Sequence, residues 1–286
     1  MSGCVRDLIV EGAHALSGDG RAAPSFPARI DAELLLMHVL SVPRAWLVSH
    51  GSDEIDAAKR ATFEALIARR ASGEPVAYIT GMRGFHAIDL RVTPDVLIPR
   101  AETELLVDLA LRRIPVDTEC RVADLGTGSG AIALAIAQAR PRAEVLATDA
   151  SATALDVARG NAARLDLRNV AFAQGDWCVA LDESRAFDLI VSNPPYIADD
   201  DPHLRQGDLR FEPHVALASG ADGLDAIRVI VRDARRHLRS GGRLLLEHGF
   251  EQGAAVLALF TQHGYSEIFT ERDLEGRERV SGGGLA

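Results

Sequence analysis

The sequence FDLIVS, residues 187–192, is followed at once by NPPY, residues 193–196. The first six residues form a mostly apolar run that contains β-branched side chains and is bounded by a proline pair, which predicts a buried parallel strand. Such a strand ends at the carboxyl edge of its sheet, where open α/β sheets bind ligands. The two prolines remove two backbone donors and restrict φ. We therefore expect a stiff rim that presents an amide, backbone carbonyls and an aromatic ring.

This rim suits the alkylation of a planar NH2 group, whose nitrogen lone pair is delocalised. The side-chain oxygen of Asn193 and the carbonyl of Pro194 are expected to accept its two N–H groups. Tyr196 is expected to pack on the flat face of the substrate, and Pro195 completes the substrate-binding motif. The alternative is a rigid strand-to-loop turn without a ligand, so the rest of the chain must decide.

A glycine-rich loop follows another predicted strand, residues 121–125, and precedes an Ala-rich helix that runs to Ala139. Glycines allow a close backbone approach to a ligand, and the start of a helix supplies positive potential. The next strand ends at Asp149, whose carboxylate is expected to accept both ribose hydroxyls of an adenosine. Asp176 and Trp177 are expected to line an adenine slot. The predicted cofactor-binding residues are Gly126, Thr127, Gly128, Ser129, Gly130, Asp149, Trp177 and Asn193.

The glycine loop alone fits two cofactors. Gly126, Gly128 and Ala131 also satisfy the fingerprint of NAD-binding proteins. Asp124, two residues before the first glycine, favours S-adenosylmethionine because an acid there would lie near the cationic end of the methionine moiety. The NPPY motif decides between them, since a hydride-transfer enzyme has no use for it.

The chain divides into two kinds of pattern. Short strands that alternate with helices predict an α/β domain with a Rossmann-like, mostly parallel seven-stranded sheet at residues 101–286. Helical periodicity predicts a small all-α domain at residues 1–75, with helices near 5–17, 31–40 and 52–70. Residues 76–100 are expected to form a β-hairpin linker, with Pro75–Gly81 and Phe85–Val92 extended. We expect the last residues, 281–286, to be the least ordered.

Composition excludes several classes of protein. The net charge of −10 and the pI near 5.4 argue against a protein that binds nucleic-acid backbone. The cysteines, Cys4, Cys120 and Cys178, fit neither a metal site nor a disulfide framework. We see no signal sequence or membrane span and expect a soluble, cytoplasmic protein. Glu247, His248 and His263 have no evident proton-transfer partner, so we interpret them as structural, as we do His38 and His50.

Several motifs carry a family resemblance. The loop that begins at Asp124, together with Asp149 and NPPY, is similar to class I methyltransferases that act on NH2 groups. The wider pattern resembles the bacterial release factor glutamine methyltransferase family, known as PrmC or HemK. The similarity covers residues 31–280 and includes YITG at 78–81, Phe85, VLIPRAETE at 96–104, FEP at 211–213, GADG at 220–223 and DLEGR at 273–277. Ala101 departs from the family, which usually has proline at this helix start.

The resemblance implies an enzyme that methylates the side-chain amide nitrogen of the glutamine in the Gly-Gly-Gln loop of class I peptide chain release factors. Its cofactor would be S-adenosylmethionine, converted to S-adenosylhomocysteine without a metal. The helical N-terminal domain would recognise the release factor, and we expect a monomer that binds no nucleic acid directly. Two alternatives stay open: a methyltransferase for exocyclic amines of nucleic acids, and a cofactor-binding scaffold without catalysis.

Overall fold

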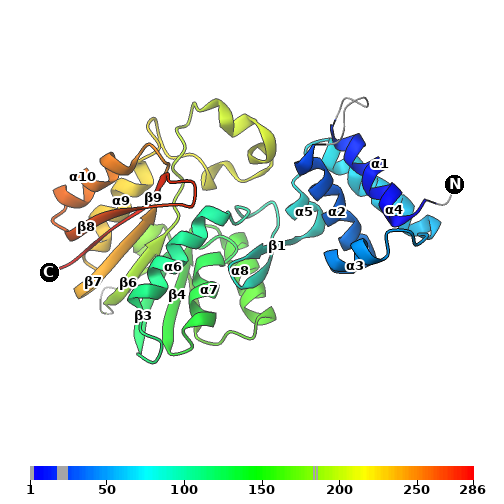
Figure 1. Cartoon of the computed structure of the whole chain (residues 1–286). Coiled ribbons are helices and arrows are strands. Elements are labelled where there is room, and N and C mark those ends of the chain that lie inside the picture. The colour runs from blue at the N-terminus through cyan, green and yellow to red at the C-terminus, as the bar shows by residue number, and fades with distance from the viewer. Residues whose placement is uncertain (1–2, 18–24, 183, 185) are drawn as a thin grey trace. The chain divides into compact units, whose positions relative to one another are not determined.

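The computed structural model describes residues 3–17, 25–182, 184 and 186–286. The chain forms two compact units, Met1–Gly81 and Met82–Ala286 (Figure 1). Residues 18–24, which lie between the first two predicted helices, are outside the described residues. In the described part of the chain, no helix combines the length and the apolar character needed to cross a bilayer. The three cysteines are free thiols.

The first unit is helical, as predicted. Its helices are α1 (Val5–Ser17), α2 (Phe26–Leu40), α3 (Arg44–Ser49), α4 (Ala57–Ala71) and α5 (Val76–Thr80). Two helix starts differ from the prediction. Helix α2 begins earlier because Ser25 accepts a hydrogen bond from the Ala28 amide at 3.3 Å. Helix α4 begins later than expected because Asp56, and not Ser52, is its N-cap and accepts from the Lys59 amide at 2.9 Å.

The prediction that Pro75–Gly81 is extended is wrong. It forms α5, in which the amides of Tyr78 and Ile79 each donate to the Pro75 carbonyl at 3.0 Å. Three consecutive side chains of α5 are buried, which an alternating strand with one buried face does not allow. Gly81, with φ of 71°, then ends the helix.

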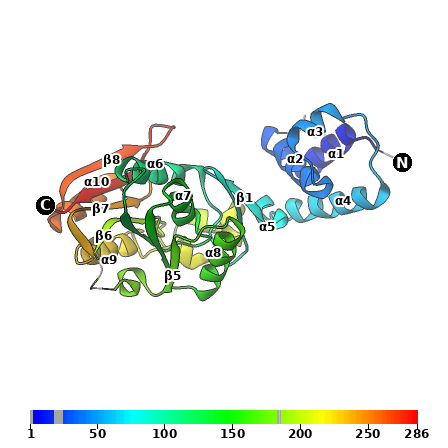
Figure 2. The ribbon, with the colours of Figure 1, turned by 90° about the horizontal axis from the view of Figure 1, so that it is seen from below.

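A β-hairpin does follow, formed by β1 (Met82–Phe85) and β2 (Ile88–Arg91). It lies against α8 (Ala152–Arg164), as both views show (Figures 1 and 2). The Asn161 side chain of α8 accepts from the Arg91 amide at 2.7 Å and donates to the Arg91 carbonyl at 2.9 Å. The hairpin therefore belongs to the second unit, and the boundary between the units falls between Gly81 and Met82. We had expected a helical domain that ends at residue 75 and a separate linker at residues 76–100.

The second unit is built on a seven-stranded sheet of order β5-β4-β3-β6-β7-β9-β8. Its strands are β3 (Cys120–Leu125), β4 (Ala143–Asp149), β5 (Val170–Gln174), β6 (Phe187–Ser192), β7 (Leu238–Glu247), β8 (Ser266–Arg272) and β9 (Glu278–Gly284). The pairs among β3 to β7 are parallel, and β9 pairs antiparallel with β7 and β8. The predicted mostly parallel seven-stranded sheet is confirmed.

The strand order reverses between β3 and β6, where ligands of open α/β sheets bind. The chain moves outward from β3 to β5 and then returns to place β6 beside β3. The register pairs Leu125 with Ser192. The glycine loop and the NPPY motif therefore leave the sheet from neighbouring positions.

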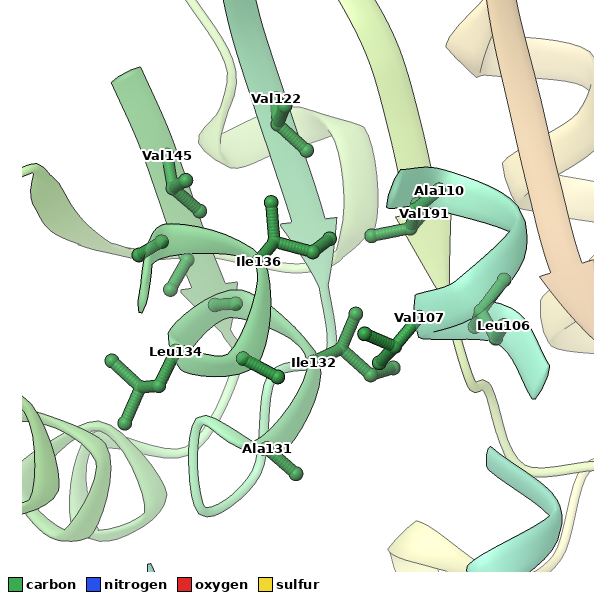
Figure 3. Close-up of a cluster of buried hydrophobic side chains, with 14 of the residues drawn as sticks. Leu106, Val107, Ala110, Val122, Ala131, Ile132, Leu134, Ile136, Val145 and Val191 are labelled. Atoms are coloured by element: carbon green, nitrogen blue, oxygen red, sulfur yellow. The ribbon is translucent and has the colours of Figure 1, made fainter. Parts of the chain in front are cut away.

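Alternate residues of the central strands supply the two sides of the core. In β3, Val122 belongs to one buried cluster and Ala123 to the other. Figure 3 shows Ile136 of α7 (Ala131–Ala139) among Val122, Val145 and Val191. Burying one such side chain is worth about 1.5–3 kcal/mol. Helices α6 (Glu104–Arg113), α7 and α8 contribute to this cluster, and α9 (Asp225–Ala234) and α10 (Gly253–Gln262) contribute to the opposite one.

Residues 281–284 belong to a strand, contrary to the expectation of disorder for residues 281–286. Strand β9 continues to Gly284 and lies between β7 and β8. Its residues from Arg279 to Gly284 are buried. The expectation failed because glycines at a chain end suggest disorder, whereas here they allow close packing between two neighbouring strands.

Candidate active site

A cavity of about 470 Å³ opens at the carboxyl ends of the parallel strands, within the second unit. This volume lies in the usual range for small-molecule sites. Its lining residues are Pro94, Asp95, Val96, Leu97, Gly126, Gly128, Asp149, Ala150, Ser151, Thr153, Ala154, Gly175, Asp176, Trp177, Asn193, Pro195, Pro213, Val215 and Ala216. The cavity thus brings together the glycine loop, the end of β4, the segment after β5 and the start of the NPPY motif.

The glycine loop contributes backbone to the cavity. Gly126 has φ of 71°, and a Cβ at this position would lie 3.1 Å from the Trp177 ring. Both facts favour glycine. The loop is held by hydrogen bonds from the Thr127 amide to Thr148 and from the Gly130 amide to Thr127, each of 2.8 Å. Of the predicted loop residues, Gly126 and Gly128 line the cavity, whereas Thr127, Ser129 and Gly130 are buried and do not line it.

Asp124 supports the loop and does not line the cavity. It is fully buried, and its Oδ2 accepts from the Thr127 hydroxyl at 2.6 Å and from the Ala133 amide at 3.1 Å. Burial raises the pKa of Asp124 to about 7, although the hydrogen bond from Thr127 opposes the shift. Its Oδ1 has no hydrogen-bond partner among the described residues. We expected this acid beside the methionine moiety of a cofactor; its contacts instead join the loop to the first turn of α7.

Asp149 lies at the end of β4 and lines the cavity. Its Oδ2 accepts from the Gly128 amide and its Oδ1 from the Ser151 amide, each at 2.9 Å. A carboxylate oxygen has more than one acceptor site, so both oxygens keep the capacity to accept from a ligand. Asp149 therefore fixes the glycine loop and offers a pair of acceptors.

Trp177 covers the glycine loop from the β5 side. It has φ of 45°, which is uncommon for a residue other than glycine, and its side chain is half-buried. The ring packs against Gly126 and lines the cavity together with the neighbouring Asp176. This arrangement supplies a flat apolar surface beside an acid.

Asn193 lines the cavity and directly follows β6. Its Nδ2 donates to the Thr103 hydroxyl oxygen at 3.0 Å. Its Oδ1 has no donor within the described residues and is left to accept from a ligand. Pro195 lines the cavity, whereas Pro194 is buried and does not.

Tyr196 does not line the cavity. Its ring packs against the core cluster beneath α9 and α10, and its hydroxyl donates to Glu247 Oε1 at 3.2 Å. Its carbonyl accepts from Gln252 Nε2 at 3.0 Å. Burial raises the pKa of the Tyr196 phenol. The structure therefore places Tyr196 behind the motif, whereas the sequence predicted it against the substrate.

Two segments of the cavity rim were not assigned a site from sequence. One precedes Ile98, and the other is part of the long loop after NPPY, whose length already indicated a function. Glu212, whose side chain is completely buried, joins them. Its Oε2 accepts from the Ile98 amide at 3.0 Å, and its Oε1 accepts from the Arg100 guanidinium. Burial raises the pKa of Glu212, and Arg100 opposes the shift.

Two of the histidines interpreted as structural, His248 and His50, have structural surroundings. His248 is buried, with Nε2 2.9 Å from the Ser281 hydroxyl and Nδ1 2.9 Å from the Gly249 carbonyl. Burial lowers the pKa of His248. His50 stacks on Trp46, with ring centroids 4.2 Å apart. None of the described residues that line the cavity is a histidine.

Comparison with known proteins covers both units. Residues 7–81 match the family model of the PrmC N-terminal domain, and residues 102–207 match that of the methyltransferase small domain. The release factor glutamine methyltransferase of Xylella fastidiosa strain Temecula1 is 58% identical over 89% of this chain and 92% of its own length. The protein of the same name from Escherichia coli strain K12 is 46% identical over 88% of this chain and 91% of its own length.

A solved structure supports the fold. The 16S rRNA N2 G1207 methyltransferase of T. thermophilus, solved with AdoMet and guanosine, has a TM-score of 0.53 and 20% identity. The similarity covers 72% of this chain and 50% of that chain. At this identity the likeness concerns the fold alone.

Proposed function

Because the chain belongs to the release factor glutamine methyltransferase family, we propose that it methylates the side-chain amide nitrogen of a release factor glutamine. The glutamine is that of the Gly-Gly-Gln loop of class I release factors. The observation that carries the proposal is one cavity that contains a glycine loop, a paired-acceptor carboxylate and the unpaired acceptor of Asn193. This set combines a nucleoside-binding wall with a site for an NH2 group.

The residues around the cavity fit S-adenosylmethionine. Gly126 leaves space beneath the Trp177 ring that a Cβ would fill, and Asp149 offers acceptors for ribose hydroxyls. Trp177 and Asp176 suit an adenine ring with its amino group. When bound, this cofactor supplies an electrophilic methyl group on a sulfonium sulfur and leaves as S-adenosylhomocysteine. The reaction as proposed requires no metal.

The residues of the chain position the substrate amide and supply polar groups for the methyl transfer. Asn193 Oδ1 accepts one N–H group of the substrate amide, which holds its nitrogen and directs the lone pair into the cavity. Pro194 does not line the cavity, so acceptance of the second N–H group by its carbonyl, as predicted from the sequence, requires the substrate to reach past the cavity wall. Holding two reactants at near-attack distance can supply about 7–11 kcal/mol of the barrier reduction. We propose direct in-line transfer without a covalent enzyme intermediate. No strong general base is needed, because the methylated amide loses its proton readily.

The other features of the chain support a protein substrate. The net charge of −10 disfavours nucleic-acid backbone as a partner. We propose that the helical unit Met1–Gly81 contacts the release factor and that a monomer is the working form. The match of residues 7–81 to the model of the PrmC N-terminal domain supports the role of the helical unit.

Methyl transfer from tritiated S-adenosylmethionine tests the proposal. The substrates are an unmodified class I release factor, the same protein with its Gly-Gly-Gln glutamine replaced by alanine, total RNA and DNA. We expect label only in the release factor that carries the glutamine. Label in RNA or DNA would overturn the substrate and favour an exocyclic-amine methyltransferase, and no transfer to any of them would favour a binding scaffold.

Asp149→Ala tests the cofactor wall. Loss of hydrogen bonds to a charged group costs about 1.5–3 kcal/mol, so we expect the Kd for S-adenosylmethionine to rise about 10–100-fold. Turnover at saturating cofactor should change far less, because Asp149 does not touch the amide. Isothermal titration gives the Kd, and initial rates give kcat. Asp149→Asn, which keeps the shape of the side chain, is the control, and an unchanged Kd in Asp149→Ala would refute the assignment.

A further inference from the structure

Two segments of the cavity rim come from distant parts of the chain and are joined by one buried carboxyl group, that of Glu212. The first rim segment, residues 94–97, lines the cavity and directly precedes Ile98. The second rim segment, residues 213–216, directly follows Glu212 and contributes three lining residues. Glu212 accepts from the Ile98 amide at 3.0 Å and from the Arg100 guanidinium. One side chain therefore bonds the end of one rim segment to the start of the other.

The second rim segment is part of the long loop after the NPPY motif, and this loop is closed at its base. The Ile197 amide, directly after the motif, donates to the Leu217 carbonyl at 3.0 Å. The Ser219 amide donates to the Ile197 carbonyl at 2.9 Å. The loop is thus bonded to the chain after NPPY at its base and to the Ile98 amide through Glu212.

The surroundings of Glu212 make its bonds to the first rim segment strong. The Glu212 side chain is completely buried, whereas that of Arg100 is 29% exposed. Burial raises the pKa of Glu212, but Arg100 and the Ile98 amide favour its charged form. A buried carboxylate needs such compensation, and hydrogen bonds that involve charged groups are stronger than neutral ones. These compensating groups are available to Glu212 while the two rim segments lie together, so the bonds favour that arrangement.

We propose that Glu212 is a positioning residue for the cofactor, which holds both rim segments in place against S-adenosylmethionine. The inference rests on the proposed function, because the cavity is the proposed cofactor site. Glu212 does not line the cavity, so it acts through the rim. Val215 of the second rim segment lines the cavity and is 81% exposed, so a ligand can bury apolar surface against it. A rim that is already held in place lowers the ordering cost of binding.

Substitutions at both ends of the ion pair test the proposal. Glu212→Gln keeps the shape of the side chain and an acceptor for the Ile98 amide, but it loses the charge that pairs with Arg100. Arg100→Met leaves the buried carboxylate without its cation, which is a costly change. Arg100→Lys keeps a cation and is the conservative variant. For each variant we would measure the Kd for S-adenosylmethionine by isothermal titration, kcat on the release factor at saturating cofactor, and the urea midpoint.

Asp188→Asn is the matched control in the same unit. Asp188 also accepts from one backbone amide, that of Arg121 at 2.7 Å, and pairs with one arginine, Arg239. It lies in β6 and does not line the cavity. This substitution therefore removes the same kind of charge from the same kind of bond set away from the rim.

We expect Glu212→Gln to raise the Kd for S-adenosylmethionine about 10–100-fold, as for a lost bond between charged groups. Asp188→Asn should keep the wild-type Kd. Turnover of Glu212→Gln at saturating cofactor should fall far less than its affinity. Arg100→Met should raise the Kd at least as much as Glu212→Gln, and Arg100→Lys should recover most of the affinity. Adding Glu212→Gln to Arg100→Met should cause no further loss, because both residues act through one contact.

Two results would overturn the inference. One is a Kd of Glu212→Gln equal to that of Asp188→Asn, and the other is a double variant whose Kd rises by the product of the two single effects. If Glu212→Gln does not fold, hydrogen exchange of the wild-type protein decides. Exchange of the Ile98 amide should slow at saturating S-adenosylhomocysteine, because coupling between the rim and the ligand is reciprocal.

Unchanged exchange of the Ile98 amide would overturn the inference. Failure of the proposed function gives a different result, because the wild-type protein would then bind the cofactor and leave the release factor unlabelled.

Discussion

Replacing Asn193 by alanine is expected to lower kcat for methyl transfer by about 10²–10³-fold, the usual effect of removing one preorganised polar group from a reaction site. Asn193 lines the cavity, its Nδ2 is held by Thr103, and its Oδ1 is the acceptor left for the substrate amide. Without it, one N–H of the substrate is unpaired and the nitrogen loses its orientation. Single-turnover rates at saturating S-adenosylmethionine measure this effect apart from binding and product release.

Cofactor affinity separates this prediction from general damage. Asn193→Ala should leave the Kd for S-adenosylmethionine nearly unchanged, in contrast to Asp149→Ala. Asn193→Asp is the matched variant: it keeps an acceptor of the same size but loses the donor to Thr103. We expect its turnover to lie between those of wild type and Asn193→Ala. A normal kcat in Asn193→Ala, or a loss confined to cofactor affinity, would contradict the role of Asn193.

Gly282→Ala is expected to destabilise the second unit by about 1–3 kcal/mol, as overpacking of a close-packed core does. A Cβ at Gly282 would lie 2.6 Å from Leu245 Cδ2, 2.9 Å from the Leu244 carbonyl oxygen and 2.9 Å from Phe269 Cε1. Side-chain atoms can move, but the backbone carbonyl belongs to β7 in the same sheet. A lower urea midpoint with an unchanged denaturant slope would report this loss of stability.

Gly160→Ala is the matched control in the same unit. Gly160 lies inside α8, and a Cβ there would meet no atom within 4 Å. Alanine in a helix interior is favoured over glycine by about 0.5–1 kcal/mol, so this variant should be slightly more stable than wild type. If Gly282→Ala were as stable as Gly160→Ala, strand β9 would not pack between β7 and β8 as described.

The sequence by itself determined the features that depend on neighbouring residues. Apolar runs followed by the glycine loop, Asp149 and NPPY indicated parallel strands with a site at their carboxyl ends, because each signal is carried by a few consecutive residues. The register of β3 with β6 then joins these separate signals in one cavity. Local pattern failed at residues 76–80, where burial of three consecutive side chains within the helical unit favours a helix.

Only the tertiary structure decided which distant residues complete the site. Glu212 is bonded to Ile98 across 114 residues of sequence, Asn193 to Thr103 across 90, and Tyr196 to Glu247 across 51. Local periodicity carries no information about such pairs, because they form only when the sheet brings different strand ends together. The same cause accounts for Tyr196 and the C-terminal strand: a tyrosine after a strand can face either a ligand or the core, and terminal glycines can be disordered or closely packed. In each case the neighbouring elements decide.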